Sequence, residues 1–391
     1  MGSTANLGLI VVTAGFALAF VFGLTAARTN FCTMGALSDV VNMGSWTRMR
    51  TWMLAVAVAL LGTALLSLTG QIELAKSVPQ RPMLPWLSLL AGGLMFGVGM
   101  TIAGGCANRN LVRVGGGSIR SLVVLTFMAI ASYMALKGLF GQWRVNWLDP
   151  ARIDLAAFGW KDSSLATALA KATGLDARTA LAVTAAAAGA ALLAFVFKDR
   201  RFRSNGRQVT GAVVLGAIVA AGWYVTGHLG YGENPDTLET VYHATNTRTL
   251  ESFSYVAPLA YSLELLMLWT DKSLHVTFGI ALVLGTIAGS AVHSVATRTF
   301  RWEGFASTVD LRNQIVGAIM MGAGGVTALG CTIGQGLSGL STMSIGSMIA
   351  VAGIVVGSVA TLKVLVWQAE REEDGGGPAT VSSGALGTKT G

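Results

Sequence analysis

Residues 103–110 (AGGCANRN) and 328–337 (ALGCTIGQGL) each end an apolar segment on glycine followed by cysteine. The chain has only three cysteines, Cys32, Cys106 and Cys331, and two of them occupy these matching places. Glycine interrupts a regular helix and lets the backbone approach a small neighbour closely. We therefore take these two loops as the centre of the fold and as the first candidates for a functional site.

The composition predicts an all-α polytopic membrane protein. Of its 391 residues, 53% are hydrophobic and 12% are charged, and the mean hydropathy is +0.61. A soluble domain carries roughly 25% charged residues. Several apolar runs of about 20 residues are each long enough to cross a bilayer as a helix. We expect roughly nine transmembrane helices, together with re-entrant or short helices.

The net charge of +8 does not indicate a nucleic-acid partner. Basic residues gather at the cytoplasmic ends of membrane spans, and this explains the positive net charge. The loop 198–207 carries five basic residues and is predicted to be cytoplasmic, whereas the acidic loop 228–252 is predicted to lie outside. The first apolar run is long and lacks a basic leader, so we interpret it as a retained span.

The number and spacing of the cysteines exclude several chemistries. Three distant cysteines provide neither a disulfide framework nor a CxxC redox pair or zinc ribbon. The four histidines show no metal-ligand spacing. We predict no cofactor and no resident metal, and we do not expect an enzyme.

An internal repeat is visible when Cys106 is placed on Cys331. The alignment also pairs Gly92 with Gly317, Gly97 with Gly322, Gly99 with Gly324 and Gly105 with Gly330. We expect one membrane domain, residues 1–368, with half-repeats at about 8–139 and 274–368 and a connecting region, 140–273. Residues 369–391 are predicted to be a disordered tail. Transporters often bind substrate near the midplane between such repeats, so the two loops should meet there; whether the repeats are parallel or inverted stays open.

The loops predict a site for a small anion that contains sulfur. Interrupted helices present backbone N–H groups and the positive end of the helix dipole. Arginines lie near both loops, and acidic residues are scarce there; the arginines are Arg28, Arg109, Arg113, Arg120, Arg298 and Arg301. A thiol is a weak donor and a polarizable contact, which matches sulfur better than hard oxygen.

Three motifs carry a resemblance to a known family: Asn30-Phe31-Cys32, residues 104–113 and residues 330–337. The chain resembles the YeeE/YedE family, also called the sulphur transport family, from about Gly15 to Trp367 apart from the insert after Phe140. The resemblance implies thiosulfate uptake through the bacterial inner (plasma) membrane and a possible partner, a small cytoplasmic sulfur carrier of the TusA type. It also implies a central passage lined by Cys32, Cys106 and Cys331. We predict that these thiols bind substrate together with Arg113, Gly105, Gly330, Gly334 and Gly336.

Four positions depart from the family pattern. Arg109 stands where relatives usually have a small residue, and Leu329 replaces the first glycine of the second Gly-Gly-Cys. Gln335 replaces an asparagine, and Gly116 stands where an acidic residue is frequent. These differences leave the passage plausible, but they leave the preferred anion open.

Three other functions are weighed against thiosulfate transport. A membrane sulfurtransferase would carry a persulfide on an activated cysteine thiolate. A transporter for another sulfur or selenium anion would use the same passage. A Cu(I) transporter could use cysteine and methionine, but the excess of arginine over acidic residues near the loops argues against a cation.

Overall fold

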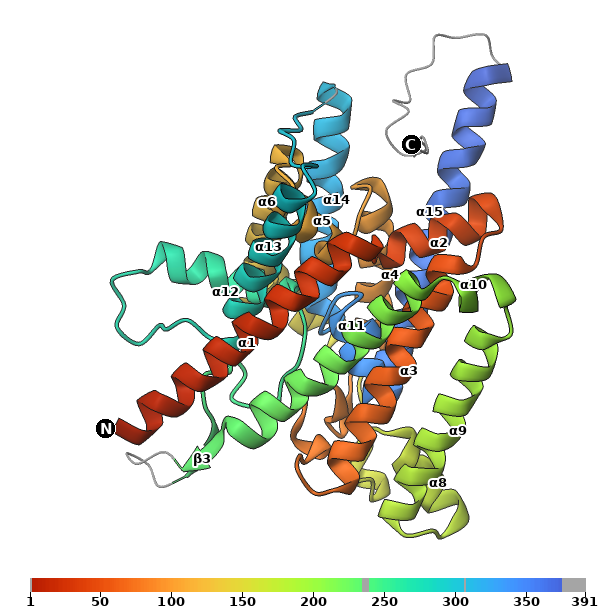
Figure 1. Cartoon of the computed structure of the whole chain (residues 1–391). Coiled ribbons are helices and arrows are strands. Elements are labelled where there is room, and N and C mark those ends of the chain that lie inside the picture. The colour runs from red at the N-terminus through yellow and green to blue at the C-terminus, as the bar shows by residue number, and fades with distance from the viewer. Residues whose placement is uncertain (1, 234–238, 306, 375–391) are drawn as a thin grey trace.

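The computed structural model describes residues 2–233, 239–305 and 307–374, and most of the regular structure in these ranges is helical (Figure 1). Eight segments are long and apolar enough to cross a membrane, close to the roughly nine that the sequence predicts. The all-α polytopic membrane fold is therefore confirmed. The helices in these segments are α1 (Gly2–Thr29), α2 (Thr33–Met43), α3 (Thr47–Leu68), α4 (Trp86–Ile102), α5 (Ala107–Gly115), α6 (Ile119–Lys137), α9 (Ala177–Phe197), α11 (Gly206–Tyr224), α13 (Phe278–Ala296) and α15 (Ile345–Asp374).

Further elements connect and complete these spans. The remaining α-helices are α7 (Leu139–Trp143), α8 (Leu165–Thr173), α10 (Arg200–Ser204), α12 (Val256–Met267) and α14 (Thr308–Thr327). Single turns of 3₁₀-helix lie at Leu74–Lys76, Val78–Gln80 and Ala156–Phe158, and π-helical turns lie at Arg144–Leu148, Val225–Leu229 and Gly334–Gly339. Two small antiparallel sheets within the described residues pair β1 (Met83–Leu84) with β2 (Ile153–Asp154) and β3 (Tyr231–Glu233) with β4 (Thr240–Tyr242). Of the predicted tail, residues 375–391 lie outside the described residues.

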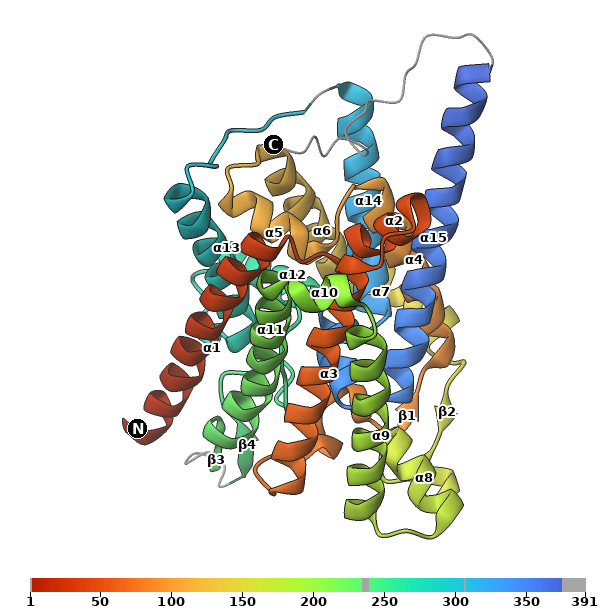
Figure 2. The same cartoon turned by 45° about the vertical axis from the view of Figure 1, so that its right-hand side comes forward.

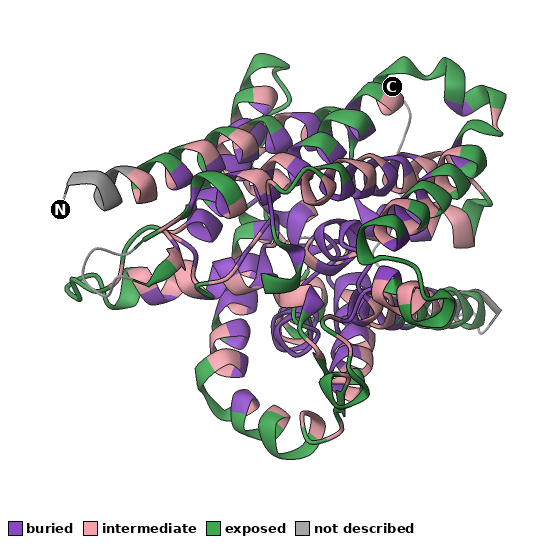
Figure 3. Cartoon of the chain, turned by 90° about the horizontal axis from the view of Figure 1, so that it is seen from below, coloured by how far each residue is buried: buried purple, intermediate pink, exposed green. Residues whose placement is uncertain are grey.

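The outer helices present apolar side chains to their surroundings. Buried residues gather in the centre of the molecule, and exposed residues cover the outer helices (Figure 3). Leu65, Val295 and Val356 are each more than half exposed although they lie within spanning helices. Scattered large apolar side chains of this kind would favour association in water, but they suit the hydrocarbon core of a bilayer.

The spans define two opposite faces. Arg50 at the start of α3 forms an ion pair with Asp199, which precedes α10, and Gln208 at the start of α11 donates to the carbonyl of Thr29 at the end of α1. We call this end, with the loop 198–207, the basic face. At the opposite face, Gln80 donates to the carbonyl of Thr342, and Ser77 pairs with Leu250.

Helices α4 and α14 cross through reciprocal glycine contacts. A Cβ atom on Gly99 would lie 2.7 Å from the carbonyl oxygen of Gly317, and one on Gly317 would lie 2.6 Å from that of Gly99. Gly92 and Gly324 contact each other's carbonyl oxygens in the same way, at 2.7 and 2.8 Å. The helices therefore run antiparallel, and each glycine that the repeat equates has the equivalent partner. Such self-complementary contacts indicate a pseudo-two-fold axis between the helices, the relation found in inverted repeats.

The two helices also end in the same way. Gly104 and Leu329 both adopt the left-handed conformation, with φ of 68° and 57°. The next N–H groups, of Gly105 and Gly330, donate back to Met100 and Gly325 at 2.9 and 2.8 Å. This pattern is the Schellman ending of a helix, which favours glycine at its left-handed position. The repeat thus extends from the sequence to the backbone, and Leu329 adopts a conformation that leucine disfavours.

Candidate functional site

The structure brings two of the three predicted thiols into contact. Cys32 precedes α2 and Cys106 precedes α5, and their sulfur atoms lie 3.9 Å apart. Both side chains are buried, and all three cysteines are unpaired. The starts of α2 and α5 therefore meet at this thiol pair. The first N–H groups of each helix have no partner within that helix.

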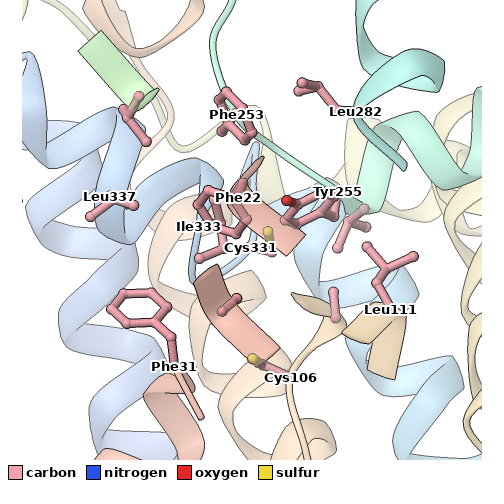
Figure 4. Packing of buried hydrophobic residues seen from close by; sticks show 14 of the residues in the cluster. Phe22, Phe31, Cys106, Leu111, Phe253, Tyr255, Leu282, Cys331, Ile333 and Leu337 are labelled. Carbon is pink, nitrogen blue, oxygen red and sulfur yellow. The ribbon is translucent and has the colours of Figure 1, made fainter. Parts of the chain in front are cut away.

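Cys331 belongs to the same buried core. It follows α14, and Figure 4 shows it near Tyr255 and Ile333, with Cys106 labelled in the same cluster. Thr332, the next residue, lies beside the Cys106 thiol. The three thiols therefore belong to one buried core, which includes residues at the starts of α2 and α5 and in the π-helical turn Gly334–Gly339.

Cys32 and Cys331 share a local geometry. The sulfur of Cys32 accepts a hydrogen bond from the Gly35 N–H at 3.4 Å, and that of Cys331 accepts one from the Gly334 N–H at 3.5 Å. Each cysteine thus caps the turn that follows it, in the manner of an N-cap serine. Because the sulfur acts as acceptor, its S–H group remains free to donate. Cys106 makes no capping bond of this length, although the N–H of Arg109, three positions after it, also lies toward its sulfur.

The predicted glycines shape the site through close packing. A Cβ atom on Gly105 would lie 3.1 Å from Cδ of Arg109, and one on Gly330 would lie 3.0 Å from Cγ of Gln335. Gly334 and Gly336 are tight in the same way against Ser254 and Trp52. The N–H groups of Gly105 and Gly330 are used in the helix endings and cannot bind a ligand. This corrects the simple expectation that the glycines expose these N–H groups.

Arg113 lies near the loop but contacts protein. Its Nη1 atom is 3.5 Å from the Gly104 carbonyl oxygen, and the side chain is half-buried. Arg28 and Arg301, which the sequence places near the loops, are exposed. Arg301 instead donates its backbone N–H to the carbonyl of Gly116 at 3.0 Å.

Buried polar atoms without a partner surround the thiols. Within the described part of the chain, Thr33 Oγ1, Asn108 Oδ1 and Thr332 Oγ1 have no hydrogen-bond partner. These side chains are at most 6% exposed, and an unsatisfied buried polar atom costs about 1–3 kcal/mol. They are suitable ligands for a polar guest. The two threonines are not among the site residues predicted from the sequence, although the motif Cys-Thr-x-Gly at both Cys32 and Cys331 contains them.

Two cavities open toward the opposite face, and Leu329 lines both. The larger, about 320 Å³, is lined by Arg81, Arg144, Arg152 and Asp149 and extends to Gln335; we call it the arginine cavity. The smaller, about 110 Å³, is lined by Glu251, Ser254, Gly334 and Ser338; we call it the serine cavity. Both therefore end beside the turn that carries Cys331.

No group of three or more His, Cys, Asp or Glu side chains within the described ranges is placed to hold a metal ion. The thiols instead lie among arginines. Arg48 pairs with Asp39 at 3.4 Å, and Arg120 pairs with Asp310 at 3.2 Å. The site therefore combines thiols, unpartnered hydroxyl groups and cationic side chains, a set that suits an anion better than a cation.

A family model described as "Sulphur transport" matches residues 28–360. The chain belongs to the sulphur transport family. The match covers all three cysteines and most of each predicted half-repeat, so the resemblance drawn from the motifs is confirmed.

Two curated proteins align with almost the whole chain. Thiosulfate transporter TsuA of Escherichia coli strain K12 is 23% identical over 367 residues, which cover 89% of this chain and 92% of the relative. Thiosulfate transporter TsuA of Spirochaeta thermophila is 25% identical over 357 residues, covering 89% and 97%.

Proposed function

We propose that the chain transports thiosulfate, or a closely related sulfur-containing anion, along a passage lined by Cys331, Cys106 and Cys32. The observation that carries the proposal is the contact of Cys32 with Cys106, at 3.9 Å, in the buried core that also contains Cys331. Membership of the sulphur transport family and the names of the two relatives support the choice of substrate.

The thiols would guide the anion by hydrogen bonding. An S–H group is a weak donor, and each thiol would hold the sulfur end of the anion only briefly. Several weak sites in series permit both entry and release. The two cavities that end at Leu329 would supply the anion to Cys331, and Thr332 beside Cys106 would connect the two stages.

The charges support an orientation in the membrane. The loop 198–207 carries five basic residues, and positive loops remain in the cytoplasm. We therefore place the basic face in the cytoplasm of a bacterial cell and the protein, as a multi-pass transporter, in the inner membrane. A TusA-type sulfur carrier would meet the chain at this face, and co-purification with the intact transporter would test that partner.

Uptake into proteoliposomes tests the function directly. The purified chain should accumulate labelled thiosulfate, and sulfite, sulfide and selenite should compete less well. Cys106→Ala should abolish uptake, whereas Ser132→Ala, a similarly small change at a buried position in α6, should preserve it. Normal thiosulfate uptake by the Cys106→Ala protein would refute a passage lined by thiols.

The proximity of Cys32 and Cys106 also favours a second candidate, a membrane sulfurtransferase. A cysteine thiolate would attack the outer sulfur of thiosulfate, form a persulfide and release sulfite with the bonding electron pair. The neighbouring thiol could then accept the transferred sulfur. Mass spectrometry of the intact chain after exposure to thiosulfate separates the two functions, because only the transferase gains the mass of a sulfur atom.

A further inference from the structure

Arg109 occupies the position at which the three thiol turns differ. Gly35 and Gly334 stand three residues after Cys32 and Cys331, and their N–H groups cap the thiols. The repeat that equates Cys106 with Cys331 also equates Arg109 with Gly334. One of two equivalent turns therefore carries glycine, while the other carries a long cationic side chain.

The side chain of Arg109 extends from the Cys106 turn to the Cys32 turn. Its stem covers Gly105, with Cδ 3.1 Å from the position that a Cβ atom on that glycine would take. Its Nη1 atom reaches within 3.5 Å of the equivalent position on Gly35. Arg109 therefore lies over the thiol pair, at the end of α2 that begins with Cys32.

The charge around Arg109 is not balanced. Nη1 of Arg48 lies 3.1 Å from the same position on Gly35, so two guanidinium groups approach one point. Asp39 lies near both, and it is bound to Arg48 at 3.4 Å. Arg109 forms no ion pair within the described residues, and its buried Nε atom has no hydrogen-bond partner there.

A second unpartnered group lies on the first turn of α2. Thr33, the first residue of α2, is 6% exposed, and its hydroxyl oxygen has no hydrogen-bond partner in the part of the chain described here. The first turn of α2 also contributes backbone N–H groups and the positive end of the helix. The first turn of α2 thus carries a buried hydroxyl without a partner, and the Arg109 guanidinium approaches the same turn at Gly35, whose N–H contacts the Cys32 sulfur.

We propose that Arg109, with Thr33, binds the oxyanion end of the transported anion on the basic-face side of the Cys32–Cys106 pair. The inference rests on the proposed transport function and adds a binding residue to it. A guanidinium group pairs with planar or tetrahedral oxyanions through two parallel hydrogen bonds, whereas the thiols match sulfur. An anion in which a sulfur atom is bonded to an SO₃ group has a sulfur end for the thiols and an oxyanion end for Arg109. Sulfide lacks the oxygens and sulfate lacks the exposed sulfur.

Equilibrium binding of thiosulfate and sulfate to the purified full-length chain tests the site. Isothermal titration should show that Arg109→Gln weakens thiosulfate binding about tenfold or more, the loss expected for a charged hydrogen-bonding partner. Arg109→Lys should retain part of the affinity, because it keeps the charge but loses the two-pronged geometry. Arg201→Gln removes an exposed charge from α10 and should leave binding unchanged.

The outcomes separate this inference from the proposed function. If the unaltered chain neither binds nor transports thiosulfate, both fail. If it transports thiosulfate and the Arg109→Gln protein binds it within twofold of the same affinity, only the role of Arg109 is overturned. If Arg109→Gln does not fold, as judged by its thermal midpoint without ligand, Arg109→Lys decides: affinity equal to that of the unaltered chain would overturn the proposal.

Discussion

The sulfur atoms of Cys32 and Cys106 lie 3.9 Å apart although 74 positions separate them along the chain. The contact forms because a cysteine directly precedes both α2 and α5, and the two helix starts face each other in the core. Asn108, on the first turn of α5, strengthens this arrangement by donating to the Phe31 carbonyl at 3.3 Å. The pair is therefore a consequence of two helix starts held together in the core, with a hydrogen bond from the Asn108 side chain to the backbone before Cys32.

Mild oxidation should join these two thiols. Diamide would remove two electrons and two protons from Cys32 and Cys106, and the sulfur atoms need only approach from 3.9 Å to about 2.05 Å. We expect two of three thiols to become unreactive toward a maleimide mass tag under denaturing conditions, with recovery after dithiothreitol. Thiosulfate uptake should fall and recover in parallel.

Single replacements provide the controls for oxidation. Cys32→Ser and Cys106→Ser should each prevent the loss of tagging, whereas Cys331→Ser should still lose its two remaining thiols. Cross-linking that requires Cys331 would contradict the arrangement of the site.

The reciprocal glycines of α4 and α14 should tolerate no side chain. A methyl group on Gly99 or Gly317 would meet the partner's carbonyl oxygen at 2.7 or 2.6 Å, so the helices would have to separate. We expect Gly99→Ala and Gly317→Ala to destabilise the protein by about 1–3 kcal/mol each, seen as a lower thermal midpoint in detergent. Gly206→Ala, which faces open space at the start of α11, should have no destabilising effect. Equal midpoints for all three variants would show that this crossing is wrong.

Gly104 and Leu329 both adopt the left-handed conformation, so Gly104→Leu and Leu329→Gly should affect stability differently. Gly104 has φ of 68°, and no neighbour lies closer than 3.8 Å to an added Cβ atom. Gly104→Leu should therefore destabilise the protein mainly through the strain of a left-handed leucine, by about 1–2 kcal/mol. Leu329→Gly should relieve a similar strain, partly offset by the greater freedom of glycine in the unfolded chain. Thermal unfolding should therefore show a clear loss for the first variant and no loss for the second. A loss for Leu329→Gly would mean that its side chain stabilises the fold.

The membrane fold and the repeat could be predicted from the sequence because both depend on short-range patterns. Apolar runs define the spans, and the glycines at 92, 99, 317 and 324 recur with the same spacing. The inverted relation could not be derived, because it depends on which glycine faces which carbonyl oxygen. That information exists only once α4 and α14 pack.

The thiols are candidate site residues on the sequence alone, whereas the contacts around them are not readable from it. Cys106 and Cys331 stand out through the repeat, but the contact of Cys106 with Cys32 joins distant parts of the chain. Thr33 and Thr332 resemble ordinary helix-start residues, and only burial without a partner marks them. Arg109 stands out in the sequence as a departure from the family pattern. Its position over the thiols depends on its packing against Gly105 and Gly35, which the sequence does not show.

The serine cavity should make uptake depend on pH through Glu251. Burial raises the pKa of this carboxyl above its ordinary value, although the Thr247 hydroxyl and N–H donate to it. The carboxyl therefore keeps its proton from the ordinary pKa of about 4.3 up to the raised pKa, and it becomes an anion only above that. A negative charge in a cavity that leads to Cys331 would repel an incoming anion, so uptake should decline as the pH rises through the raised pKa.

The same shift affects stability with a defined sign. Because the folded chain binds the proton more tightly than the unfolded chain, the contribution of Glu251 to stability declines as the pH rises through the raised pKa. Glu251→Gln keeps an acceptor for Thr247 but cannot ionise, so its uptake should lack this decline and exceed that of the unaltered chain at the upper end of the window. Initial rates in proteoliposomes across external pH, with Glu239→Gln as a control on the same loop, measure the difference. Identical pH profiles for the Glu251→Gln protein and the unaltered chain would exclude the serine cavity as the route of entry.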